Sequence, residues 1–142
     1  MKHEETYAIS EAMRDDLIAA YRDVYENCVT QVSAWRMTVR HPAKGWYVTG
    51  KQVAQILSPL LQTGQQPQMP NKNKERKYTA LLALVKELMN RRENVGKSLV
   101  QLCELAVKQP APEFFISQST ARRLITKAKA DQIKQMVGTR RR

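Results

Sequence analysis

Lysine and arginine side chains are concentrated in the last helical stretch that the sequence predicts, over residues 117–137. Apolar residues occupy one side of this stretch, and Arg123 and Lys127 fall one turn apart on the remaining arc. Arginine suits bidentate contact with phosphate. Only Asp131 offsets the cations of this helix, so we expect it to hold phosphate groups through Arg122, Arg123, Lys127, Lys129 and Lys134.

Two further basic clusters extend this expectation. One is the C-terminal tail, Arg140, Arg141 and Arg142, and the other closes a polar linker with Lys72, Lys74, Arg76 and Lys77. If the last helix enters a groove of a duplex, Gln118, Ser119 and Thr120 at its start are candidates for contact with base edges. The alternative interpretation of the basic helix is an ordinary solvated face.

The charge balance of the whole chain points to a polyanionic partner. The 142 residues include 24 Lys or Arg and 13 Asp or Glu, a formal net charge of +11. Residues 1–61 are neutral, with seven residues of each sign, whereas residues 62–142 hold 17 basic and six acidic residues. Neutralised phosphates release counterions, which favours binding without base-specific contacts. Nucleic acid is the favoured partner, with DNA preferred over RNA, and acidic proteins or anionic membranes are the alternatives.

Catalytic and metal-binding interpretations find little support. His3 and His41 lack a cysteine or carboxylate at ligand spacing, and Gly96-Lys97-Ser98 lacks the earlier glycine and strand of a phosphate-binding loop. We therefore expect a non-enzymatic protein without cofactor or metal.

The sequence also predicts a cytoplasmic protein with no membrane partner. No stretch approaches the roughly 18–20 consecutive apolar residues of a membrane span, and the first ten residues are too polar for a secretory signal. Cys28 and Cys103 lie within apolar helical patterns, where packed, reduced thiols are expected.

The sequence aligns with itself when it is shifted by 68 positions without a gap. Residues 32–57 then superpose on residues 100–125, with four of the 26 pairs identical. The matches concentrate where a basic residue, Pro-Ala, two aromatic residues, a β-branched residue and a hydroxyl residue recur in order. This pattern predicts an internal structural duplication.

Each copy is expected to contain two helices, a short strand and a third helix, so the predicted fold class is mainly α. In the first copy, apolar spacing predicts a helix from near Ser10, and Pro42 ends the second helix. Thr49 and Gln52 have the spacing of a capping box, and Pro59 is expected to kink or restart the third helix. In the second copy, residues 117–137 form the third helix.

The aromatic pairs Trp46-Tyr47 and Phe114-Phe115 fall in the two short strands. Aromatic and β-branched residues favour extended chain, so we expect residues 46–49 to pair with residues 114–117 in one small antiparallel sheet. Stacking of unpaired bases is an alternative role for these aromatics, but packing in the core is favoured.

Four segments follow from these patterns. Residues 1–61 form a neutral first repeat, residues 62–77 a polar basic linker, residues 78–137 a basic second repeat, and residues 138–142 a basic tail.

The block Pro110-Ala111-Pro112-Glu113-Phe114-Phe115-Ile116-Ser117, followed by Ala121-Arg122-Arg123, resembles a segment of small basic proteins of bacterial phages and mobile elements. The resemblance covers about 30 residues, and the first copy departs from it at Lys44 and Gly45. It implies a phage or mobile-element setting and does not indicate an activity.

Taken together, the residues predict a non-enzymatic nucleic-acid-binding protein that holds phosphates through its second repeat and tail. Two alternatives stay open. One is a protein-interaction or assembly subunit of a nucleic-acid-processing complex, which would dock through the neutral first repeat, and the other is an RNA-binding accessory factor. A homo-oligomer is also left open.

Overall fold

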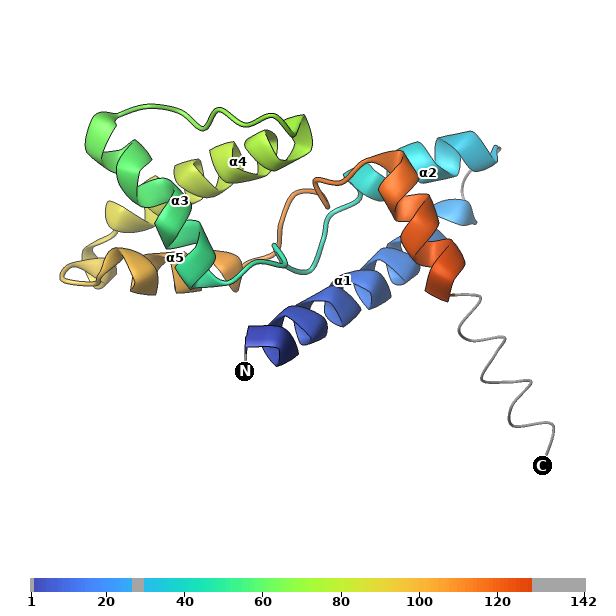
Figure 1. The fold of residues 1–142 in the computed structure, drawn as a ribbon, viewed down its shortest axis with the longest axis horizontal. Helices are drawn as coiled ribbons and strands as arrows, with labels where there is room; N and C mark the ends of the chain where they lie inside the picture. Colours follow the sequence, from blue (N-terminus) through green and yellow to red (C-terminus); the bar gives the residue numbers. More distant parts are fainter. Residues whose placement is uncertain (1, 27–29, 129–142) are drawn as a thin grey trace. The chain divides into compact units, whose positions relative to one another are not determined.

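The computed structural model describes residues 2–26 and 30–128, which fold mainly into helices (Figure 1). The helices are α1 (Lys2–Tyr25), α2 (Gln31–Arg40), α3 (Gly50–Thr63), α4 (Lys72–Met89), the short 3₁₀ helix η1 (Arg92–Asn94) and α5 (Leu99–Val107). Residues 118–128 form a further helical segment, which we call helix 118–128. The prediction of a mainly helical fold is confirmed. None of the helices in the described ranges combines the length and apolar character needed to cross a membrane.

Several helix ends lie where local sequence signals predict them. The Thr49 hydroxyl accepts a hydrogen bond from the Gln52 N–H, and the Gln52 side chain accepts one from the Thr49 N–H, so the capping box is confirmed. Helix α2 ends at Arg40, immediately before His41 and Pro42. The Ser117 hydroxyl accepts from the Thr120 N–H at the start of helix 118–128. Each of these signals acts through residues within about one helical turn, and the observed helix ends agree with them.

One predicted helix start is wrong, and one of the two effects expected of Pro59, a restart of the helix, does not occur. Helix α1 begins at Lys2 and not near Ser10, because the strong helix formers before Ser10 extend the helix upstream. Pro59 lies inside α3 without restarting it, and α3 runs on to Gly64, which has a left-handed backbone (φ 71°). Pro59 and Gln55, four residues earlier, are both exposed, so water is able to satisfy the carbonyl that lacks its helical partner.

The predicted strands and their sheet are also wrong, since the described residues contain no strand. Tyr47 and Phe115 have positive φ angles of 58° and 57°. A left-handed residue turns the chain and interrupts the alternation of side chains that a strand requires. The turn at Phe115 lets two successive aromatic side chains, Phe114 and Phe115, both be buried.

The connection between α3 and α4 is shorter than the predicted linker. Residues 62–63 belong to α3, and α4 begins at Lys72, so only residues 64–71 lie outside the two helices. The Asn71 side chain accepts hydrogen bonds from the N–H groups of Asn73 and Lys74 and so caps α4 within the predicted linker. Lys72, Lys74, Arg76 and Lys77 are therefore helical.

The chain forms two compact units that do not follow the order of the predicted copies. Unit 1 contains α1, α2 and the described residues 112–128, and unit 2 spans Lys44–Ala111 with α3, α4, η1 and α5. Helix α3, from the first copy, thus packs with the two helices of the second copy. Helix 118–128, from the second copy, belongs to the unit of α1 and α2.

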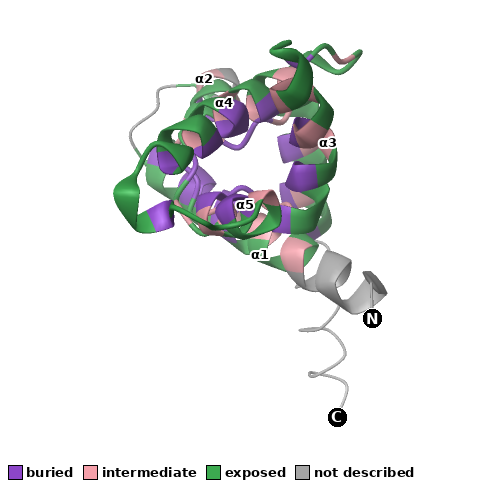
Figure 2. Cartoon of the chain, turned by 90° about the vertical axis from the view of Figure 1, so that its left-hand side faces the viewer, coloured by how far each residue is buried: buried purple, intermediate pink, exposed green. Residues whose placement is uncertain are grey.

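Unit 2 is a three-helix core in which α3 has its most extensive contact with α5, and α4 contacts both. Buried residues line the inner faces of these helices (Figure 2). They are Val53, Ala54 and Leu57 from α3, Tyr78, Leu81, Leu82, Val85 and Leu88 from α4, and Leu102, Cys103 and Ala106 from α5. The side-chain amide of Asn94 donates to the Leu88 carbonyl and ties η1 to the end of α4.

Unit 1 buries the apolar stripe of α1 against α2. Tyr21 stacks on Trp35 with ring centroids 4.4 Å apart, and the Phe114 N–H donates to the Val39 carbonyl. The buried residues of this unit are Asp16, Leu17, Ala20, Tyr21 and Val24 from α1, Ala34, Thr38 and Val39 from α2, and Ala43, Phe114, Phe115, Ala121, Ile125 and Ala128. Cys28 and Gly138 lie outside the described residues.

Candidate nucleic-acid interface

Helix 118–128 separates apolar and cationic side chains by face. Ala121, Ile125 and Ala128 are buried, whereas Arg122, Arg123 and Lys127 are exposed. This division is the one that the sequence predicts. In the described part of the chain, no ion pair involves Arg122, Arg123 or Lys127. Their charges face solvent, as contact with phosphate requires.

The start of this helix carries hydroxyl groups that bond with one another. The Ser117 hydroxyl lies 2.8 Å from the Thr120 hydroxyl and 3.1 Å from the Ser119 hydroxyl. Of the three residues predicted to reach base edges, Gln118 and Ser119 are exposed and Thr120 is partly buried. Lys129, Lys134, Arg140, Arg141 and Arg142 lie outside the described residues.

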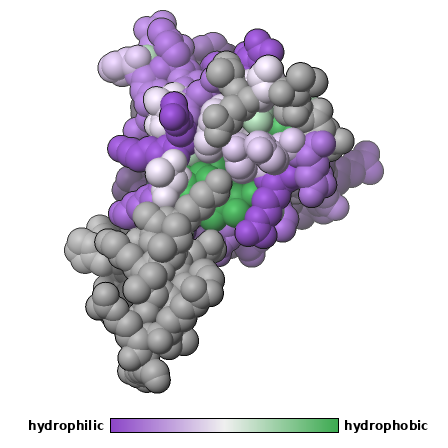
Figure 3. Space-filling view, turned by 90° about the vertical axis from the view of Figure 1, so that its right-hand side faces the viewer, coloured by the Kyte–Doolittle hydropathy of each residue, from purple (hydrophilic) through white to green (hydrophobic). Residues whose placement is uncertain are grey.

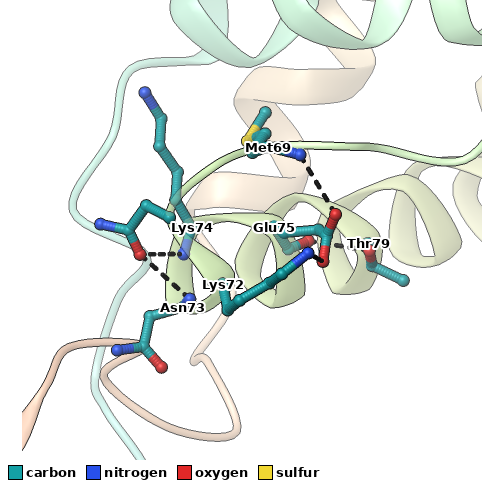
Figure 4. A network of polar contacts seen from close by, with 7 residues as sticks. Met69, Lys72, Asn73, Lys74, Glu75 and Thr79 are labelled. Carbon is teal, nitrogen blue, oxygen red and sulfur yellow. Dashed lines mark hydrogen bonds and ion pairs between the residues drawn. The ribbon is translucent and has the colours of Figure 1, made fainter.

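The second cationic cluster occupies the first two turns of α4 in unit 2. A polar network reduces its positive charge (Figure 4): Glu75 accepts hydrogen bonds from the Met69 N–H at 3.1 Å and from the Lys72 ammonium at 3.4 Å. The Met69 N–H, aided by Lys72, lowers the pKa of Glu75. Lys72 is thus partly neutralised, and residues 64–71 are tied to α4 through Met69.

Lys77, in the same cluster, is largely withdrawn from water. Burial lowers the pKa of its ammonium to about 8, and the nearby charge of Lys74 adds to this effect. Lys77 therefore holds its proton less firmly than an exposed lysine, and the cluster offers less charge to a phosphate than its four cationic residues indicate.

We expect Lys77→Met to stabilise the protein at pH 7. In the folded protein the Lys77 pKa is about 8, against 10.5 for free lysine, so the unfolded chain binds more protons between these values. The stability advantage of the variant over wild type should therefore shrink across this window. The gain at pH 7 should be roughly 1–3 kcal/mol, towards the lower end because Lys77 is partly exposed.

Urea unfolding at pH 7 and pH 10 measures this difference. Lys86→Met, at an exposed position on the same helix, is the matched control and should have little effect. An equal decrease in stability from Lys77→Met and Lys86→Met would contradict the burial of the Lys77 ammonium group.

The structure divides the predicted site between two compact units. Helix 118–128 belongs to unit 1, and the α4 cluster belongs to unit 2. Unit 1 holds 13 basic and nine acidic residues, a formal charge of +4, and unit 2 holds 11 and four, a charge of +7. The imbalance between sequence halves is therefore smaller between the units, because the acidic α1 shares a unit with the basic C-terminal residues.

A groove in unit 1 brings together cationic residues that sequence reasoning missed. It has a volume of about 610 Å³ and is lined by Val24, Arg36, Met37, Arg40 and His41. Arg36 and Arg40 lie one turn apart on α2, are exposed, and form no ion pair within the described residues. Met37, between them in sequence, is 49% exposed.

His41 also lines the groove. Its Nδ1 lies 2.8 Å from the Pro42 carbonyl oxygen, and its Nε2 lies 3.1 Å from Asp23 Oδ2. Both partners are oxygen atoms that accept hydrogen bonds. The sequence offered His41 no carboxylate at ligand spacing, and the fold supplies one from α1, 18 residues earlier.

One signal in the sequence would have found this cluster. All seven acidic residues of the first 61 precede residue 27, and no acidic residue occurs from residue 27 to residue 74. A net charge taken over residues 1–61 averages an acidic first helix with a basic second one. Charge counted helix by helix would have singled out Arg36 and Arg40.

The remaining candidate residues take structural roles. Trp46 and Phe114 are each 4% exposed and Phe115 is 8% exposed, so these rings belong to the core and offer no stacking surface. Burial raises the pKa of the Cys103 thiol to about 11. Gly96 has a left-handed backbone and Ser98 caps α5, which makes Gly96-Lys97-Ser98 a turn leading into a helix. Within the described ranges, no group of three or more His, Cys, Asp or Glu is placed to hold a metal ion.

Comparison of the chain with protein-family models, with curated proteins and with solved structures finds no match.

Proposed function

We propose that this chain is a non-enzymatic nucleic-acid-binding protein that prefers DNA to RNA. The observation that carries the proposal is helix 118–128, whose buried apolar face anchors three exposed cations that no carboxylate neutralises among the described residues. Cations on a rigid, anchored helix lose little freedom when they meet a phosphate backbone. The remaining predicted contacts, in the tail and in the α4 cluster, add to this surface in the proposal.

The test is the salt dependence of duplex DNA binding. For wild type, log K plotted against log salt concentration should be steep, and Arg122→Ala, Arg123→Ala and Lys127→Ala combined should reduce the slope by about 0.9 for each phosphate that the variant no longer neutralises. The affinity should fall to a similar extent for unrelated sequences, because backbone contacts carry no sequence information.

A control with the same change of charge separates this surface from net charge alone. Lys86→Ala, Arg91→Ala and Arg92→Ala combined also remove three exposed cations, but from unit 2. We expect a much smaller change in slope. Equal effects of the two triple variants, or a flat slope for wild type, would overturn the proposal.

An assembly subunit is the second candidate function, favoured by one observation. Tyr25, at the end of α1, is 56% exposed, and an apolar surface on this part of the chain suits a protein partner. A stable oligomer or complex in solution without nucleic acid would support it. Competition between duplex DNA and structured RNA decides between DNA and the remaining alternative, an RNA-binding accessory factor.

We also propose that the chain is an internal duplication whose third helices have exchanged places. Tyr47 and Phe115, paired by the 68-residue shift, are the two non-glycine residues with positive φ in the described ranges. Leu57 and Ile125 are also paired by this shift, and both are fully buried. Backbone geometry that is rare for aromatic residues therefore recurs at matching positions. The paired variants Leu57→Ala and Ile125→Ala test this arrangement.

A further inference from the structure

The groove between α1 and α2 combines cationic and apolar side chains. Arg36 and Arg40 supply positive charge, and the half-exposed Met37 side chain supplies apolar surface. A duplex presents its phosphates on the outside, where exposed cations can contact them. The flat faces of its paired bases are stacked inside the double helix and are not accessible. An apolar surface beside phosphate-binding cations therefore suits a nucleotide whose base is unpaired.

We propose that this groove binds an unpaired nucleotide of a single strand or strand end, an inference that rests on the proposed function. Arg36 and Arg40 hold consecutive phosphates, and the base lies on the Met37 thioether. The groove volume, about 610 Å³, falls within the range of roughly 300–1,000 Å³ typical of small-ligand sites. Figure 3 shows one face of the molecule, on which an apolar area is framed by hydrophilic residues.

The residues of the groove favour a nucleotide over an acidic peptide. Each planar guanidinium group of Arg36 and Arg40 can donate two hydrogen bonds to a pair of phosphate oxygens. The two residues lie one helical turn apart, with Cβ atoms about 6 Å from each other, close to the repeat of phosphates along an extended strand. The Met37 side chain is polarisable and unbranched, which suits a flat aromatic face.

Two contacts fix the His41 ring in place. The ring is held by Pro42 in its own loop and by Asp23 on α1. Asp23 is 71% exposed in its side chain and is the acidic group that faces His41 across the groove wall. Its carboxylate would repel a phosphate beside His41, so we assign the phosphate contacts to the two arginines.

The test compares a blunt duplex with the same duplex carrying a single-stranded overhang of ten thymidines. Wild type should bind the overhang duplex at least fivefold more tightly at equal salt concentration. Arg36→Ala combined with Arg40→Ala should abolish this preference while leaving most of the blunt-duplex affinity, and Met37→Asp should do the same by placing a negative charge on the apolar surface.

Matched controls exist in unit 2. Arg91→Ala with Arg92→Ala removes the same charge, and Val95→Asp changes a residue that is 81% exposed. Both should retain the overhang preference, and thermal unfolding establishes that every variant is folded.

The outcomes separate this inference from the proposed function. Absence of any DNA binding by wild type would overturn both. Tight duplex binding without an overhang preference, or a preference that survives the groove variants, would overturn the groove proposal alone. Displacement of the ten-thymidine strand from the groove by an equally charged oligoglutamate would also overturn it, because the groove would then recognise charge without a base.

Discussion

Leu57→Ala is expected to cost about 2–5 kcal/mol of stability and to loosen α4 and α5 more than α1 and α2. Leu57 is fully buried in the core of unit 2, where α3 packs on α5. Truncation removes the packed atoms and leaves a cavity that the neighbouring helices fill only in part. Although α3 lies between α2 and α4 in sequence, its contacts lie with the two helices that follow it.

Hydrogen exchange measured by peptide makes this prediction specific. In Leu57→Ala the amides of α4 and α5 should exchange faster, while those of α1 and α2 keep their protection. Ile125→Ala is the counterpart, because Ile125 is 1% exposed and its helix belongs to unit 1. It should have the reverse pattern. Faster exchange of α1 and α2 in Leu57→Ala, with α4 and α5 unchanged, would contradict the exchange of third helices.

Gly50→Ala is expected to destabilise unit 2 by roughly 1–3 kcal/mol, although alanine favours a helix more than glycine does. A Cβ atom at Gly50 would lie 2.8 Å from the Glu104 nitrogen and 2.9 Å from its Cα atom. These are backbone atoms of α5, so relief requires movement of one helix against the other. The helix-propensity gain of about 1 kcal/mol is too small to offset this overlap.

Gly45→Ala is the matched control for this substitution. The nearest atoms to a Cβ at Gly45 are 3.8 Å away in the Tyr47 ring, an ordinary contact. Its stability should change by less than about 1 kcal/mol. Thermal or urea unfolding measures both variants, and a Gly50→Ala protein as stable as wild type would show that α3 and α5 do not approach as closely as described.

Local sequence signals predicted most of the helices. The capping box at Thr49 and Gln52, the stop before Pro42 and the cap at Ser117 act through hydrogen bonds and sterics within one turn. Apolar spacing likewise indicated the buried faces of α1 and α4. Whether Pro59 restarts the helix depends on exposure, which the residues around it do not reveal.

The left-handed turns at Tyr47 and Phe115 could not be predicted from local residue preferences. Aromatic residues prefer extended chain and seldom adopt positive φ, so a short strand was the natural prediction. Burial of the neighbouring rings offsets a backbone cost of about 1–2 kcal/mol for each left-handed residue. The prediction failed because tertiary packing overrode local preference.

The candidate interface likewise has one part that the sequence predicted and one part that it did not. Periodicity alone placed Arg122, Arg123 and Lys127 opposite the buried stripe of their helix, and the structure has that arrangement. The groove at Arg36 and Arg40 was missed because its walls come from two helices.

By itself, the sequence determined which segments become helices, where several of them end, which faces they bury and how much positive charge the chain carries. These properties depend on residues within a turn or two of each other. Only the tertiary structure decided that α3 shares a core with α4 and α5, that helix 118–128 belongs to the unit of α1 and α2, and that Arg36 and Arg40 line a groove. Apolar periodicity marks a face for burial, but complementary packing between distant segments selects its partner.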